Sequence, residues 1–564
     1  MGFALSRPAA AAALPTALPT LTIRNLTVTP LEVKLVERLE SHSHPHLHKA
    51  KGLVKVSSHV TNPEESHEPD APLPSATAAQ HDEPPPPSKQ DITGVTISPF
   101  AECHTPVYAP DPARHEHLRL TFEDRNTGHL YSAEIPASSR RSIVLKPLAR
   151  DTEEEETKEF TAIYLPQHAH LALFSSANLT SWMSTLDDTL PLSALSIPGT
   201  HNSPTCHVAL PSVRCQAVPV LDQLHNGVRF LDVRVSCPVY TPPPPPPSRS
   251  GTTSNTANSP NHQTPIPELS LVHSAFPISL TGPKYLSTLL STLYTFLDAH
   301  PSETILLSLK REGTGRGSDA DLAQILHTYY ISTPDNYHHH DTPDPNPNHQ
   351  QQHHHHHQPQ QRWYTASHLP TLSQARGRIV LVRRFRLPPH MSASEHGGID
   401  GSVWPDNVAD GTCGSGTIRI QDYYGIGSGG GEIQQKVRFA QEGLQRAAQG
   451  AVVARGWGDG NGNGNGMAGV KVPETPPPPL FINFLSASNF FNASCWPDRI
   501  AVKINPSMIE YLCMGHGAPG KGPAELDIGD AATGIVVTDW VGHHGDWDLV
   551  RCIVGWNARL QLRQ

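Results

Sequence analysis

Short apolar runs typical of β-strands recur through the C-terminal two-thirds of the chain and alternate with helical patterns. In the clearest helical pattern, residues 284–298, leucine and phenylalanine recur at i, i+3, i+4 and i+7, and Pro283 suits the helix start. The strand-like runs are 192–199, 229–235, 268–274, 304–312, 378–385, 418–424, 480–488 and 534–541. Repeated strand–helix units predict an α/β fold, an irregular TIM-type β/α barrel over residues 179–564.

The preceding region has a different pattern. Residues 20–175 contain runs that alternate apolar and polar side chains, beginning at 21–38, which predicts a small β-rich domain, in a sandwich arrangement. Polar, Pro-rich sequence near 57–95 is expected to form a disordered insertion in it. Residues 1–19 are expected to be a flexible N-terminus. Pro-, His- and Gly-rich tracts predict disordered, solvent-exposed loops in the barrel at 241–265, 335–361 and 455–478.

Composition excludes several classes of function. The formal net charge of the 564 residues is −10 and no basic run is present, which argues against a nucleic-acid partner. None of the 8 cysteines forms a CxxC pair, so a structural zinc site is not expected, and reduced thiols are favoured. No apolar run of about 18 residues occurs, so no transmembrane helix is predicted. The N-terminus is a poor secretory signal, so the cytoplasm or a membrane surface is favoured over secretion, and a monomer is expected.

Polar or ionisable residues stand at the ends of the strand-like runs. They are His201, Arg234, His273, Lys310, Arg384, Asp422 and Asp539. In a β/α barrel the carboxyl ends of the strands converge on one face, where active sites are built. A single histidine at a strand end is more often structural, but seven such residues in register indicate a site.

The residue types in this set suggest a reaction. Two histidines can divide the work of general base and general acid, and a carboxylate can hold one imidazole in the required tautomer. A guanidinium matches phosphate oxygens and stabilises the negative charge that develops on them. A second arginine, a lysine and an aspartate suit a hydroxyl-rich ligand. Together they predict cleavage of a phosphodiester whose attacking and leaving groups are both alcohols.

Several motifs resemble those of a known family. They are SIPGTHNS (196–203), GVRFLDVRV (227–235), PSETILLSLKRE (301–312), WPDN (404–407), QDYY (421–424), INF (482–484) and TDW (538–540). Their order and approximate spacing resemble the landmarks of bacterial-type phosphatidylinositol-specific phospholipase C, over most of residues 179–564. The resemblance implies an irregular β/α barrel and a reaction through a cyclic inositol phosphate, at a membrane surface that carries phosphatidylinositol or a related phospholipid.

The resemblance also implies a role for each matching residue. His201 would be the base that activates the inositol 2-hydroxyl, with Asp539 orienting it, and His273 would protonate the departing diacylglycerol oxygen. Arg234 would bind the phosphate oxygens. Lys310, Arg384 and Asp422 would hold inositol hydroxyls, and Tyr424 would stack on the ring.

Two positions bear on metal dependence and rate. Calcium-dependent eukaryotic phospholipases C of the same superfamily place a carboxylate where this chain has Arg234, and a guanidinium there would repel Ca²⁺, so no metal and no cofactor are predicted. Asn202 departs from the bacterial pattern, which has aspartate after the first histidine. Asparagine cannot share a proton, so Asn202, included among the catalytic candidates, is expected to weaken proton donation by His273.

Three alternatives stay open from the sequence. The same two histidines would serve a phosphodiesterase that acts on another lipid phosphodiester. A barrel retained for binding lipid or inositol phosphate, with little turnover, is favoured by Asn202 and disfavoured by the presence of both histidines, Arg234 and Asp539. The third is a scaffold whose N-terminal β region binds a partner. No amphipathic stretch with exposed aromatics stands out as an interfacial anchor, and ordinary packing is expected for Trp182 and Met183.

Overall fold

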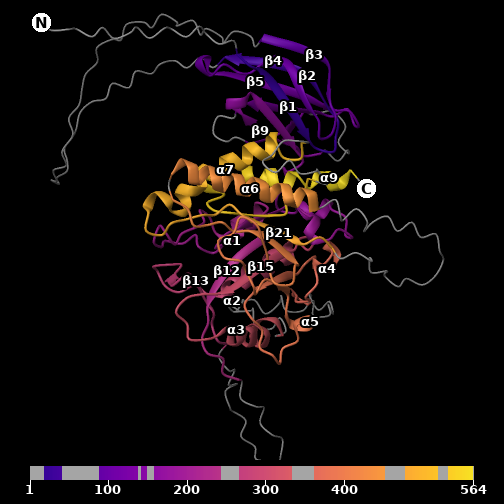
Figure 1. Cartoon of the computed structure of the whole chain (residues 1–564). Coiled ribbons are helices and arrows are strands. Elements are labelled where there is room, and N and C mark those ends of the chain that lie inside the picture. The colour runs from indigo at the N-terminus through magenta and orange to yellow at the C-terminus, as the bar shows by residue number, and fades with distance from the viewer. Residues whose placement is uncertain are drawn as a thin grey trace, which may run out of the picture.

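The computed structural model describes residues 18–40, 88–136, 142–148, 158–242, 266–332, 361–427, 429–450, 477–518 and 531–562. Within them the chain forms an all-β part followed by a larger α/β part, and helices lie between the two (Figure 1). Most of the predicted flexible N-terminus and of the Pro-, His- and Gly-rich loops lies outside the described residues. No described helix is long and apolar enough to cross a membrane.

The N-terminal part consists of two five-stranded sheets. The first has the order β4 (Glu102–Tyr108), β1 (Thr20–Leu26), β10 (His170–Phe174), β9 (Thr161–Leu165) and β7 (Ser142–Val144). The second has the order β3 (Ser88–Ile97), β2 (Leu31–Glu40), β5 (Glu116–Asp124), β6 (Leu130–Ile135) and β8 (Lys146–Pro147). Apolar side chains from both sheets, such as Ile23 and Phe122, share one buried core, as expected where two sheets pack face to face.

Two details differ from the sequence-based expectation for this part. Residues 21–38 form two strands, because Asn25 organises a turn between them: its amide donates to the Thr29 carbonyl and its Oδ1 accepts from the Thr27 backbone N–H. The last part of the predicted insertion near 57–95 is a strand, because β3 begins at Ser88 and pairs antiparallel with β2. The remainder of that segment lies outside the described residues.

The second part is built on a 12-stranded sheet whose main path is β16-β17-β15-β12-β11-β22-β21-β20-β19. Neighbours from β16 to β20 are all parallel, and β19 is antiparallel to β20. The bounds are β11 Ile197–Thr200, β12 Phe230–Ser236, β15 Ile305–Arg311, β16 Trp363–Tyr364, β17 Ile379–Arg384, β19 Gly411–Thr412, β20 Ile418–Gln421, β21 Leu480–Phe484 and β22 Ile535–Thr538. Off this path lie β13 Ser270–His273, β14 Phe276–Pro277 and β18 Ile399–Asp400. The parallel strands are mostly buried and begin with apolar residues, as parallel strands covered on both faces do, and charged residues follow towards the carboxyl ends of β12, β15 and β17.

The helices of this part connect and cover the strands. They are α1 Val220–His225, α2 Leu286–Ala299, α3 Asp319–Ile325, α4 Leu372–Ala375, α5 Ala393–His396, α6 Gly430–Gly450, α7 Pro497–Met514, α8 Asp548–Gly555 and α9 Ala558–Gln561. The predicted helix 284–298 corresponds to α2, whose leucines are buried in the main core. The α/β class is confirmed. A closed barrel is not seen, because no described strand pairing joins β16 to β19.

Two predicted strands need correction. Residues 192–199 are not one strand: Leu192–Ala194 form a 3₁₀ turn and only the end of the run forms β11. The run 268–274 does not belong to the parallel set, because β13 is antiparallel to β12. His273 therefore does not stand at the carboxyl end of a parallel strand, although it still reaches the same region as His201.

The two parts are packed together through α7 and α8. The guanidinium of Arg24 on β1 is buried and donates to the carbonyls of Cys513 and His516, at 3.1 and 2.8 Å. Phe174 of β10 joins the apolar cluster that contains Trp556. Figure 1 shows α6 and α7 between the β-rich part and the strands of the second part.

Candidate active site

Strand register brings three cations into one row. Arg234 on β12 is directly opposite Lys310 on β15, and Lys310 is opposite Arg384 on β17. Because side chains alternate across a strand, residues paired in register between parallel strands point to the same face. The three cations predicted from the strand ends therefore share one edge of the sheet.

His201 and Asp539 are brought together in the same way. Thr200 ends β11 and is paired with Thr538 of β22, so the residues that follow them are neighbours. Nδ1 of His201 lies 3.0 Å from Oδ1 of Asp539. The side-chain amide of Gln216 donates to the backbone oxygens of His201 and Thr538, at 2.7 and 2.9 Å, which fixes both strand ends. Burial lowers the pKa of His201, but Asp539 and Cys215 together outweigh burial and raise that pKa to about 10.

The side chain of Asn202 contacts the imidazole of His201. Its φ of 43° lies in the left-handed region, which asparagine tolerates better than most residues. The amide Nδ2 lies 3.1 Å from Nε2 of His201 and 3.7 Å from Sγ of Cys215. Its buried Oδ1 has no hydrogen-bond partner among the described residues.

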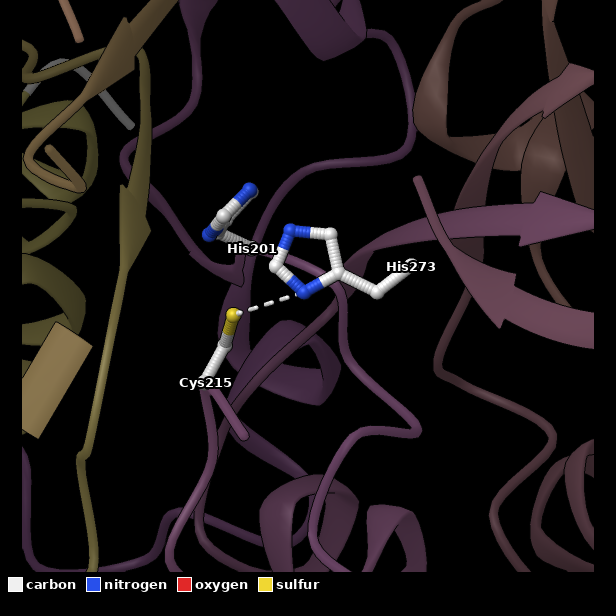
Figure 2. Close-up of side chains that lie close together, drawn as sticks. All are labelled: His201, Cys215 and His273. Carbon is white, nitrogen blue, oxygen red and sulfur yellow. Dashed lines mark hydrogen bonds between the residues drawn. The ribbon is translucent and has the colours of Figure 1, made fainter. Parts of the chain in front are cut away.

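His273 stands beside His201. The two rings are 5.9 Å apart between centroids and nearly perpendicular, at 87°. Nδ1 of His273 lies 2.8 Å from the carbonyl oxygen of Val213 and 3.8 Å from Sγ of Cys215. Figure 2 shows the sulfur of Cys215 beside both imidazoles.

The sequence analysis assigned no role to Cys215. Its thiol is fully buried, which opposes ionisation, but the charges of His273 and His201 outweigh burial and lower the pKa of the thiol to about 6. No motif points to this residue, because it comes from the irregular segment between β11 and α1. Only the folded chain brings it to the two histidines.

Two carboxylates that the sequence analysis also missed hold the row of cations. Asp232 is fully buried; its Oδ2 and Oδ1 lie 3.2 Å from nitrogens of Arg234 and Arg384, respectively. Burial raises the pKa of Asp232, but Arg234 and Arg384 outweigh it, so the net shift is downward. Glu312 pairs with Lys310 at 2.7 Å and with Arg234 at 3.3 Å. These two cations outweigh burial and lower the pKa of Glu312 to about 2.

A signal for these carboxylates was present in the sequence. Asp232 precedes Arg234 by two positions on β12, so the two side chains lie on the same face of that strand. Glu312 follows Lys310 by two positions, just beyond the end of β15, and continues the face on which Lys310 lies. An acidic residue two positions from a basic one at a strand end therefore marks a charge pair.

The remaining predicted ligand-binding residues border this cluster. The guanidinium of Arg384 lies 3.8 Å from the centroid of the Trp404 ring, and the Trp404 indole N–H donates to Asp422 at 2.9 Å. Tyr424 is 41% exposed, and its hydroxyl donates to Asp406 at 2.8 Å. Trp404 and Asp406 both come from the WPDN motif, which thereby connects Arg384, Asp422 and Tyr424.

Comparison with known proteins bears on these motifs. No protein-family model matches the chain. The 1-phosphatidylinositol phosphodiesterase of Listeria monocytogenes is 27% identical over 218 residues, which cover 37% of this chain and 50% of that protein. The protein of the same name from Staphylococcus aureus strain Newman is 25% identical over 268 residues, covering 45% of this chain and 68% of that protein. The motif resemblance is therefore confirmed. The match spans about half to two-thirds of the length of these relatives.

Solved structures of phosphatidylinositol-specific phospholipases C also match. One from Staphylococcus aureus is 21% identical, with a TM-score of 0.44, and the match covers 68% of this chain and 98% of that one. One from Listeria monocytogenes is 18% identical, with a TM-score of 0.40, and covers 68% and 99%.

Proposed function

We propose that the chain is a phosphodiesterase that cleaves phosphatidylinositol-type lipids to diacylglycerol and a cyclic inositol phosphate. The observation that carries the proposal is one sheet edge where an aspartate-paired histidine, a second histidine and three aligned cations lie together. Sequence similarity to bacterial 1-phosphatidylinositol phosphodiesterases supports the choice of substrate. We also propose that the sheet is the wall of an irregular TIM-type barrel, since its strands run parallel from β16 to β20 and gather these side chains at their carboxyl ends.

The proposed reaction uses His201 as general base. It takes the proton of the inositol 2-hydroxyl, whose oxygen attacks phosphorus, and the bond from phosphorus to the diacylglycerol oxygen breaks. His273 gives a proton to that departing oxygen. Asp539 stabilises the imidazolium that forms on His201. Because the same carboxylate raises the pKa of His201, the base becomes available only as pH rises through that value.

Arg234 supplies the positive charge at the phosphate in this proposal. Asp232 and Glu312 pair with Arg234, fix the orientation of its guanidinium and stabilise its positive charge. A guanidinium stabilises the oxygens of the transition state without a metal. Lys310, Arg384, Asp422 and Tyr424 would bind inositol hydroxyls around it. We therefore propose catalysis that needs no metal ion.

Exposed aromatic side chains next to this edge support action at a lipid surface. Phe276 on β14, three residues after His273, stacks on Phe490 with 5.3 Å between ring centroids. Phe491, in the same loop after β21, is 95% exposed. Large exposed apolar groups such as Phe490 and Phe491 suit contact with lipid. Trp182 and Met183 are buried, as ordinary packing predicts, and do not contribute.

The test is a phosphorus NMR assay on phosphatidylinositol vesicles with excess chelator, using wild type, His201→Ala and, as a control, the exposed His225→Ala. We expect a cyclic inositol phosphate signal from wild type and His225→Ala and none from His201→Ala. Product only after calcium is added would contradict the role of Arg234. No product from folded wild type under either condition would favour a lipid-binding module or another phosphodiester substrate.

A further inference from the structure

Cys215 lies beside both histidines, and the proposed reaction does not use it. It is held firmly: its backbone N–H donates to Thr205 Oγ1 at 3.0 Å, and its carbonyl accepts from the Trp540 N–H at 2.9 Å. The sulfur is therefore kept beside the imidazoles by contacts on both sides of its own residue.

We propose that His201, Cys215 and His273 form a binding site for zinc or a similar thiophilic divalent ion, and that its occupation blocks the site. Each residue offers one ligating atom, and these atoms all lie within 4.8 Å of one another (Figure 2). Tetrahedral zinc bonds of about 2.0–2.3 Å put ligating atoms about 3.4–3.7 Å apart. Sγ of Cys215 and Nδ1 of His273 are already 3.8 Å apart, and zinc would replace the contact of that nitrogen with the Val213 carbonyl.

The donor set selects the kind of ion. A thiolate with two imidazoles suits zinc or another soft first-row ion, whereas Ca²⁺ and Mg²⁺ require oxygen ligands. Three protein ligands leave a fourth position open. The Asp539 carboxylate accepts from Nδ1 of His201, which is the contact that orients histidine ligands in zinc proteins. Binding would release to solvent any proton carried by the thiol or by the ligating imidazole nitrogens, so that the site holds zinc with a thiolate and neutral imidazoles.

Occupation would have a direct consequence for the reaction. Because Nδ1 of His201 faces Asp539, zinc would bind Nε2 and take the lone pair of the base, so His201 could not accept the proton of the substrate hydroxyl. This part of the inference rests on the proposed function, whereas metal binding does not. The site would make the enzyme sensitive to free zinc, and a chelator would restore activity.

Cobalt substitution tests metal binding without reference to turnover. Co²⁺ bound to a thiolate gives a sulfur-to-metal charge-transfer absorption, which the His353–His357 run cannot give because it has no sulfur. We titrate the full chain with Co²⁺ and then compete with Zn²⁺, comparing wild type with Cys215→Ser. Cys206→Ser is the matched control, since Cys206 lies in the same segment between β11 and α1. Circular dichroism and thermal unfolding report whether each variant is folded.

We expect the charge-transfer band in wild type and Cys206→Ser and its loss in Cys215→Ser. His273→Gln, which keeps the thiol, should weaken zinc binding by at least about tenfold, because even an outer partner of a ligand is worth about 10–100-fold. Absence of the band in wild type, or its persistence in Cys215→Ser, would overturn the site. If the band is present and zinc at saturating concentration leaves phosphodiesterase turnover unchanged, the blocking role is wrong. A chain that binds cobalt but cleaves no phosphatidylinositol would refute the proposed function and not the metal site.

Discussion

Replacement of Asp232 by asparagine removes one negative charge from between two guanidinium groups and keeps the shape of the side chain. The carboxylate is fully buried and lies 3.2 Å from nitrogens of both Arg234 and Arg384. At such separations and an effective dielectric constant of about 20, each pair attracts by about 4 kcal/mol. Desolvation of the three groups offsets much of that attraction. Removal of one member of a buried pair nevertheless costs about 3–5 kcal/mol, because the remaining charge stays buried without a counter-charge.

We therefore expect Asp232→Asn to lower the free energy of unfolding of the α/β part by about 3–5 kcal/mol. Denaturant-induced unfolding of the full chain, followed by circular dichroism and tryptophan fluorescence, measures it. Asp410→Asn is the matched control: Asp410 also pairs with a strand arginine, Arg419 at 2.6 Å, but the two side chains are 37% and 41% exposed. Its loss should cost no more than about 1 kcal/mol. A loss below about 1 kcal/mol in Asp232→Asn, or equal losses in both variants, would refute the reasoning.

Three further predictions concern other parts of the molecule. Asp539→Asn should lower the pKa of His201 and shift the acid limb of the kcat/KM–pH profile to lower pH, with kcat reduced roughly 10³–10⁴-fold as in other triads; an unshifted limb would contradict the pairing. Burial lowers the pKa of Lys436 from 10.5 to about 7, so the unfolded state binds more protons between these values and stability should rise with pH across that window. Lys436→Met should reduce this rise, as measured by thermal midpoints at pH 7 and 9, and an identical slope would count against it. Phe491→Ser should reduce turnover on vesicles and leave turnover on a soluble monomeric substrate unchanged, whereas the similarly exposed Val502→Ser should change neither.

The parallel strands explain why much of the site could be predicted. When apolar runs such as 304–312 and 378–385 pair in parallel, their carboxyl ends meet at one edge, so the polar residue at each end is placed by the strand alone. That holds for Lys310 and Arg384, which are paired in register. The argument required only hydrophobic pattern and length, which the sequence contains.

The same argument fails where position depends on pairing direction or irregular backbone. His273 reaches the site from β13, which is antiparallel to β12 and forms a hairpin with β14. Its place at the site therefore does not follow from the convergence of parallel strand ends. Cys215 arrives from a segment without periodicity. Asp232 lies inside an apolar run, where a buried carboxylate is tolerated only because two arginines from different strands face it. Such pairs depend on which strands become neighbours in the sheet, and the local sequence pattern of a strand does not determine its neighbours.

The departure at Asn202 follows from the same neighbourhood. The left-handed backbone there accepts aspartate as readily as asparagine, so conformation does not select between them. Charge does: the backbone N–H of Asn202 lies 3.3 Å from Oδ2 of Asp232, and its amide N–H lies 3.7 Å from Sγ of Cys215. An aspartate would face an ionising thiol with like charge, whereas the amide donates to the sulfur. Asparagine at 202 is thus the electrostatic match for Cys215, and the two residues together distinguish this site from one with aspartate beside the first histidine.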